Sequence, residues 1–171
     1  MAAMHALVAV RAALAATAAC AALVTTPAVA ADYVTIRKEV TVARPADAVW
    51  ARIGDYCGIA EWMKVTCTYV SGNGDVGTVR TLNNATVLEP MVAKTARSYT
   101  YVQTQGNLAH AAYHGTLAAE PDGPRRTRLV YTLFYDQAAL ASDALRASEH
   151  ARLDKRFLDL LTEMKRLAEA K

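Results

Sequence analysis

A single glutamate, Glu89, stands where a buried strand would place apolar side chains. It lies in the run 85–92, and its alternation partners Ala85, Val87 and Met91 are apolar. Residues that alternate along a strand share one face of the sheet, so we expect this carboxylate on the buried face. A buried charge needs partners, because desolvating an unpaired charge is costly.

Tyrosines recur with the same alternation in the strands predicted after Glu89. They are Tyr99, Tyr101, Tyr113, Tyr131 and Tyr135. Tyrosine is a common strand residue, so packing alone would explain any one of them. Five with matching alternation around a carboxylate favour a cavity wall with hydroxyl groups pointing inward. We expect Trp50 to pack near one end of that cavity.

Glu89 has two interpretations that the sequence leaves open. In a cavity it would accept a hydrogen bond from a ligand hydroxyl or abstract a proton. As a structural residue it would pair with Arg80 on the neighbouring strand. Arg80 could instead meet an anionic head group of the ligand. We therefore take Glu89, Arg80, Trp50 and the five tyrosines as candidate ligand-binding residues.

No nucleophile–base pair and no metal-binding spacing accompany these residues. His110, His114 and His150 have no spacing that would bring them together with cysteines or carboxylates. We expect neither a metal nor a cofactor, and no firm catalytic residue. We expect His114 to face solvent and His110 to lie beside a loose segment, residues 104–109, where a cavity entrance would be.

Residues 1–31 have the layout of a secretory signal peptide. They contain one charge, Arg11, then an apolar run over residues 12–24, and then small residues before a cleavage point. The uninterrupted apolar run is shorter than the roughly 20 residues needed to span a bilayer. We expect a mature single domain, residues 32–171, that is periplasmic or secreted and has no membrane span.

The charge of the mature chain argues against a nucleic-acid partner. Removing Arg11 leaves 18 Lys+Arg against 16 Asp+Glu, a net charge of +2, and no basic stripe stands out. Cys57 and Cys67 are the cysteines that remain after cleavage. An oxidising compartment favours a disulfide between them, and the alternative is two separately buried thiols.

Periodicity predicts one strand, two short helices, six further strands and a long C-terminal helix. The first strand covers residues 33–43, and the helices follow up to about residue 60. The later strands are expected over residues 65–71, 76–82, 85–92, 97–103, 111–120 and 127–136. The last helix starts at Ser142 or Asp143, and its slim first half, with Ala144, Ala147 and Ala151, would leave room for a ligand.

This order of elements resembles the START/Bet v 1-like (SRPBCC) superfamily, and within it the polyketide cyclase/dehydrase and lipid-transport group. The residues that carry the resemblance are Ala46-Asp47-Ala48-Val49-Trp50, Ile53-Gly54-Asp55-Tyr56, Trp62, Gly77-Thr78-Val79-Arg80, Glu89, Tyr99-Thr100-Tyr101 and Tyr113-His114-Gly115. The resemblance implies an α+β helix-grip fold, in which a seven-stranded antiparallel curved sheet wraps around a long C-terminal helix. It also implies a cavity for lipophilic molecules, lined in several relatives at the positions of Glu89, Tyr99 and Tyr113.

The superfamily has no shared catalytic set, so the resemblance transfers none. We expect an exported binding protein for a small hydrophobic or amphipathic ligand, lipid- or polyketide-like, rather than an enzyme. One alternative is a cyclase or dehydratase, a lyase or isomerase with Glu89 as general base. Another is a periplasmic accessory protein that docks to a redox enzyme through its surface.

Overall fold

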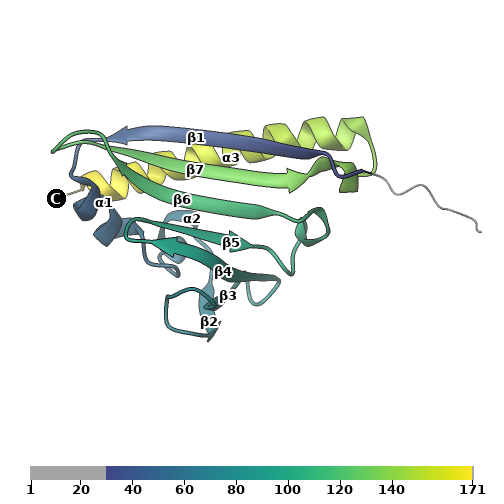
Figure 1. The fold of residues 1–171 in the computed structure, drawn as a ribbon, viewed down its shortest axis with the longest axis horizontal. Helices are drawn as coiled ribbons and strands as arrows, with labels where there is room; N and C mark the ends of the chain where they lie inside the picture. The colour runs from purple at the N-terminus through teal and green to yellow at the C-terminus, as the bar shows by residue number, and fades with distance from the viewer. Residues whose placement is uncertain (1–29, 171) are drawn as a thin grey trace, which may run out of the picture.

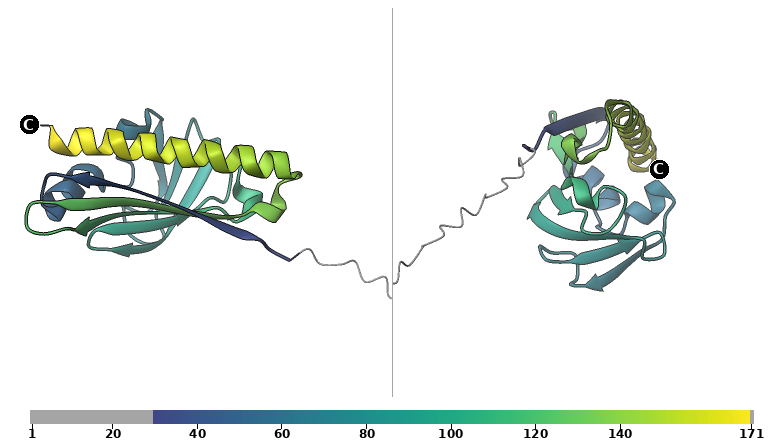
Figure 2. Two further views of the ribbon diagram at one scale, coloured as in Figure 1. Left: turned by 90° about the horizontal axis from the view of Figure 1, so that it is seen from above. Right: turned by 90° about the vertical axis from the view of Figure 1, so that its right-hand side faces the viewer.

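The computed structural model describes residues 30–170, and its main element is a seven-stranded antiparallel sheet that curves around a long helix (Figures 1 and 2). The strands are β1 (Tyr33–Val42), β2 (Cys67–Ser71), β3 (Val79–Leu82), β4 (Val87–Thr95), β5 (Ser98–Val102), β6 (His114–Pro121) and β7 (Thr127–Asp136). The helices are α1 (Ala46–Ile53), α2 (Ile59–Met63) and α3 (Asp143–Glu169), with 3-10 turns η1 (Ala109–Ala111) and η2 (Gln137–Ala139). The predicted α+β helix-grip fold is confirmed.

The strand order is β1-β7-β6-β5-β4-β3-β2, so the chain forms a meander from β2 to β7 and places β1 beside its last strand. The strands β1 and β2 lie at opposite edges of the sheet, and the two short helices connect them. Figure 1 shows α1 near the C-terminal end of α3, and the left view of Figure 2 shows α3 lying along one side of the sheet.

The core lies between the concave face of the sheet and the part of α3 that begins at Leu153. Along β7, Leu129, Tyr131, Leu133 and Tyr135 are fully buried, as the alternation predicts. The apolar stripe of α3 is buried only from Leu153 onward. Its members are Leu153, Phe157, Leu160, Leu161, Met164 and Leu167.

The prediction that Ala144, Ala147 and Ala151 make room for a ligand beside the first half of α3 was wrong, although Arg152 and Leu153 of that half do line the cavity described below. These three alanines are exposed and do not line that cavity, and Leu145 is 52% exposed. The reason is that the first three turns of α3 lie largely outside the core, so the size of their side chains does not control the space inside.

The strands β2 to β6 all begin one to three residues later than the sequence predicts, and the shift is largest, three residues, for β3 and β6, each preceded by a residue with a positive φ angle. Gly77 has φ +89° in the loop that ends where β3 begins, at Val79. Ala112 has φ 49° after η1, and β6 begins at His114. Tyr113 therefore lies at the entry of β6 rather than inside it.

A disulfide tethers the segment before α2 to the first residue of β2. It joins Cys57 to Cys67, whose Cα atoms are 5.5 Å apart. Between them, α2 ends at Met63, and the next residue, Lys64, adopts a left-handed conformation with φ 59°. The covalent link therefore restrains the short helix that contributes Ile59 and Met63 to the cavity described below.

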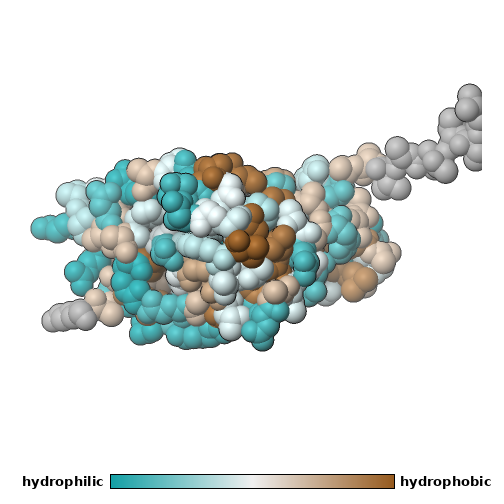
Figure 3. All heavy atoms as spheres, turned by 90° about the horizontal axis from the view of Figure 1, so that it is seen from below, coloured by the Kyte–Doolittle hydropathy of each residue, from teal (hydrophilic) through white to brown (hydrophobic). Residues whose placement is uncertain are grey.

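The large apolar side chains that are exposed in the described residues come from several elements, and two of them, Tyr33 and Phe134, pack edge to face with ring centres 5.9 Å apart. These exposed side chains are Tyr33, Val70, Val76, Val92, Phe134, Leu145 and Leu158. Figure 3 shows one face of the molecule, on which separate apolar patches are surrounded by polar surface. Between residues 30 and 170, no helix combines the length and the apolar character that a membrane span needs. The predicted signal peptide lies outside the described residues, except for Ala30 and Ala31.

We predict that replacing both cysteines, in the variant Cys57→Ser/Cys67→Ser, lowers the free energy of unfolding by about 3 kcal/mol, because the unfolded chain regains the freedom of the closed loop. Urea denaturation followed by circular dichroism measures this change. Wild-type protein treated with a reductant should unfold like the variant. Equal stability of variant and oxidised wild type would contradict the prediction.

Candidate ligand-binding cavity

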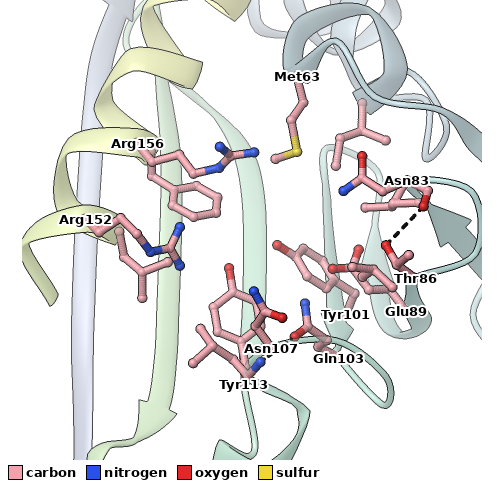
Figure 4. A pocket seen from close by; sticks show the side chains of 16 residues that line it. Met63, Asn83, Thr86, Glu89, Tyr101, Gln103, Asn107, Tyr113, Arg152 and Arg156 are labelled. Carbon is pink, nitrogen blue, oxygen red and sulfur yellow. Dashed lines mark hydrogen bonds between the residues drawn. The ribbon is translucent and has the colours of Figure 1, made fainter. Parts of the chain in front are cut away.

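A cavity of about 310 Å³ lies between α2, the strands β3 to β5, the loop before η1, and α3 (Figure 4). Its apolar lining consists of Ile59, Met63, Leu82, Val87, Leu108, Leu153 and Phe157. Its polar lining consists of Asn83, Thr86, Glu89, Tyr101, Gln103, Asn107, Tyr113, Arg152 and Arg156. The predicted loose segment, residues 104–109, thus contributes to the cavity through Asn107 and Leu108.

Glu89 and Arg80 form a buried ion pair at one side of this cavity. They face each other across β3 and β4 in the antiparallel register. The Nε and Nη2 atoms of Arg80 donate to the same oxygen, Oε2 of Glu89, at 2.9 and 2.7 Å. Arg80 is fully buried and Glu89 is 4% exposed. The predicted structural pairing is therefore present.

The rest of the Arg80 guanidinium is enclosed by tyrosines. Its Cζ atom lies 3.9 Å from the ring centre of Tyr56, 5.0 Å from that of Tyr101 and 5.8 Å from that of Tyr99, distances that allow cation–π attraction. Its Nη1 donates to the backbone oxygen of Tyr56. Burial acts to lower the pKa of Arg80, but the Glu89 carboxylate and the surrounding tyrosines together outweigh burial and raise the pKa above its ordinary value.

The two oxygens of the Glu89 carboxylate have different surroundings. Oε2 is held by Arg80, whereas no residue between 30 and 170 donates a hydrogen bond to Oε1. Because Glu89 also lines the cavity, the two interpretations left open by the sequence are compatible. One oxygen neutralises a buried arginine, and the other can accept a hydrogen bond from a ligand.

Tyr101 and Tyr113 place hydroxyl groups in the cavity. The hydroxyls of Tyr101 and Tyr131 are 2.9 Å apart and share a hydrogen bond. The Tyr101 ring lies over Gly115 of β6, where a Cβ atom would come within 2.5 Å of its Cζ. Burial raises the pKa of Tyr101 well above its ordinary value and also raises that of Tyr113. Both hydroxyls therefore stay protonated at neutral pH.

The other predicted residues lie outside the cavity wall. Arg80 is behind Glu89, and Tyr131 packs on Phe157 with ring centres 4.6 Å apart. Tyr135 is fully buried in the core, and its hydroxyl has no hydrogen-bond partner in the described chain. Tyr99 and Trp50 line a second depression near the α1–α2 connection. These residues lie on the concave side of the sheet, as predicted. That side extends beyond the cavity, and the part outside the cavity is covered by α1 and α3.

The histidines of the loop and of β6 do not line the cavity either. His110 is exposed in η1. His114 lies on the outer face of the sheet, stacked on Phe134 with ring centres 4.5 Å apart. Within residues 30–170, no group of three or more His, Cys, Asp or Glu side chains is arranged to hold a metal ion.

Sequence reasoning missed Arg152 and Arg156, which reach the cavity from α3. They are four residues apart, so they lie on one side of the helix, beside the buried Leu153 and Phe157. Figure 4 shows both guanidinium groups directed from α3 toward the space above Tyr113. Their position next to the apolar stripe was the available signal. A long charged side chain beside such a stripe can lie at the edge of the buried face while its head group stays partly in solvent.

The fold and the cavity define this protein as a member of the START/Bet v 1-like superfamily. More narrowly, the chain belongs to the family of polyketide cyclase / dehydrase and lipid transport proteins, whose family model matches residues 33–169. No curated protein matches the chain.

Several solved structures share the fold. The Zhui aromatase/cyclase from Streptomyces sp. R1128 has a TM-score of 0.63 and 20% identity, covering 81% of this chain and 94% of that one. Ara h 8.0201 has a TM-score of 0.62 and 18% identity, with 80% and 98% covered. Norcoclaurine synthase from Thalictrum flavum, in complex with dopamine and hydroxybenzaldehyde, has a TM-score of 0.57 and 16% identity, with 80% and 87% covered. Identities this low show the shared fold alone.

We predict that Glu89→Gln lowers the free energy of unfolding by about 3 kcal/mol, because it leaves the buried charge of Arg80 without a counter-charge. The double variant Arg80→Met/Glu89→Leu removes both charges and should recover most of this loss. Urea denaturation of the three proteins measures both effects.

A matched control is Glu120→Gln, which breaks the exposed pair with Arg128 and should cost less than about 1 kcal/mol. A Glu89→Gln variant as stable as Glu120→Gln would show that the buried pair does not carry the stability assigned to it.

We predict that Gly115→Ala destabilises the protein by about 1–3 kcal/mol, because its methyl group displaces the Tyr101 ring. The same substitution should cost much less in a Tyr101→Leu background, where the ring is absent. A double-mutant cycle measured by denaturation gives this coupling. If Gly115→Ala lowers the free energy of unfolding equally in both backgrounds, the destabilisation comes from the backbone at residue 115 and not from the Tyr101 ring.

Proposed function

We propose that the protein is exported and holds a small hydrophobic or amphipathic molecule in the cavity between its sheet and α3, as a carrier or sensor. The observation that carries the proposal is the cavity itself. Its volume of about 310 Å³ is at the lower end of the range of small-molecule sites, and its lining combines apolar side chains with a few fixed polar groups.

The two kinds of lining have separate roles in this proposal. The apolar side chains of α2, β4 and α3 supply affinity, at roughly 25 cal/mol for each Å² of apolar surface that the ligand removes from water. The polar groups orient the ligand: Oε1 of Glu89 accepts a hydrogen bond, and the hydroxyl of Tyr113 donates one. Family membership supports a ligand of lipid or polyketide type.

Export is supported by two independent features. Residues 1–31 have the composition of a secretory signal. Cys57 and Cys67 form a disulfide, a bond that persists in oxidising compartments such as the bacterial periplasm. We propose a periplasmic or secreted location on these grounds.

The proposal predicts that Val87→Trp abolishes ligand retention, because the indole fills the cavity that Val87 lines. Val92→Trp is the matched control, since it places the same side chain in the same strand at a position that is 45% exposed. Native mass spectrometry of each protein, purified without detergent from the compartment to which it is exported, detects the bound lipophile. A wild-type protein without ligand, or retention by Val87→Trp equal to that of Val92→Trp, would contradict the proposal.

A cyclase or dehydratase activity is the second candidate, and one observation favours it: a carboxylate oxygen of Glu89 faces the cavity. The hydrogen bonds from Arg80 to Glu89 oppose a catalytic role. A general base must take up a proton, and that proton would compete with the Arg80 guanidinium for the carboxylate. Incubating the protein with its co-purified ligand separates the two candidates. A carrier returns the ligand unchanged, whereas an enzyme returns a product that has lost water or gained a ring.

A further inference from the structure

A cluster of hydrogen-bond donors lies on the α3 side of the cavity. It consists of Tyr113, Arg152 and Arg156, named here the donor cluster. Figure 4 shows the Tyr113 hydroxyl directed toward the two guanidinium groups. Burial raises the pKa of Tyr113, and the nearby charges of Arg152 and Arg156 offset part of that rise. The hydroxyl is thus a neutral donor beside two cations.

The ionisable groups that line the cavity leave a surplus of positive charge. Glu89 is compensated by Arg80. Arg152 pairs with Glu149, whose Oε2 and Oε1 accept at 2.8 and 2.5 Å. Arg156 has no ion-pair partner within residues 30–170, although its neighbours on α3 form several such pairs. The surplus is therefore about one charge, and it is located at Arg156.

We infer that the ligand is a lipophilic carboxylate, whose acid group is bound by the donor cluster and whose apolar body lies against the cavity wall. The guanidinium of Arg156 can bind a carboxylate through two parallel hydrogen bonds. Arg152, one helical turn away, offers a second guanidinium to the same group. A surplus of one positive charge matches a monoanion better than a phosphate dianion. This inference rests on the proposed function and names the class of its ligand.

The test compares three molecules with the same alkyl chain and different head groups: decanoate, decanol and decyl phosphate. Each is titrated against the full-length mature protein, freed of co-purified lipophile and loaded with Nile red, at one fixed ionic strength. We expect decanoate to displace the dye at about one tenth of the concentration that decanol needs, which corresponds to about 1.4 kcal/mol.

The variants assign this preference to the donor cluster. Arg156→Gln should remove most of the preference for decanoate and leave the affinity for decanol unchanged. Tyr113→Phe should weaken decanoate binding by a smaller factor. The control is Lys155→Gln, which removes one positive charge from the neighbouring residue of α3, where Lys155 is 79% exposed and lines no cavity. It should keep the preference of the wild type.

Each other outcome has a distinct meaning. Equal affinity for decanoate and decanol overturns the inference and leaves the proposed function intact. Tighter binding of decyl phosphate overturns the assignment of a carboxylate. If Arg156→Gln and Lys155→Gln lose the preference for decanoate equally, the role of the donor cluster is overturned. The general positive potential around α3 would then explain the preference. Failure of all three molecules to displace the dye overturns the inference, and failure of Nile red itself to bind overturns the proposed function as well.

Discussion

The buried ion pair of Arg80 and Glu89 is the interaction on which the rest of the structure depends. A fully buried guanidinium must have its charge and its donors satisfied inside the protein. Here β4 supplies the counter-charge, the α1–α2 connection supplies a backbone oxygen, and the rings of Tyr56, Tyr99 and Tyr101 surround the cation. The hydroxyl of Tyr56 also donates to the backbone oxygen of Glu89 at 2.9 Å. These contacts fix the segment that leads into α2, and so they help to set one wall of the cavity.

The two sides of the cavity are built differently. The polar groups on the sheet are held by the ion pair, by the hydrogen bond between Tyr101 and Tyr131, and by close packing against Gly115. The arginines of α3 are exposed side chains on long stems; Arg152, for example, is 51% exposed. Such a side chain changes rotamer without disturbing the core. The sheet side therefore presents fixed geometry, and the helix side presents adaptable charge, an arrangement that suits a ligand with an apolar body and one polar end.

The fold could be predicted because each of its strands has a local signal, whereas the site depends on tertiary placement. Alternation correctly assigned Glu89 and the tyrosines to the concave side, and the pairing of Glu89 with Arg80 follows from a hairpin register. Alternation does not show where along a curved strand the cavity lies, so Tyr131 and Tyr135 could not be separated from Tyr113. The positive φ angle of Ala112 has no sequence signal, because alanine rarely adopts it. The position of Arg156 beside the apolar stripe is a sequence signal for the edge of the helix, but only the placement of the sheet shows that this edge meets a cavity.

Shared architecture does not decide between binding and chemistry, because the same helix-grip fold carries a cyclase, a synthase and this protein at identities of 20% or less. The decision rests on the polar groups inside the cavity. A general base needs a carboxylate free to gain and lose a proton, and in this chain that carboxylate also neutralises an arginine with no exposure to water. Protonating Glu89 would leave Arg80 unpaired in the core, so each catalytic cycle would work against the stability of the fold. A hydrogen bond from a ligand to the remaining oxygen of Glu89 carries no such cost, so the proposed binding function uses this arrangement without conflict.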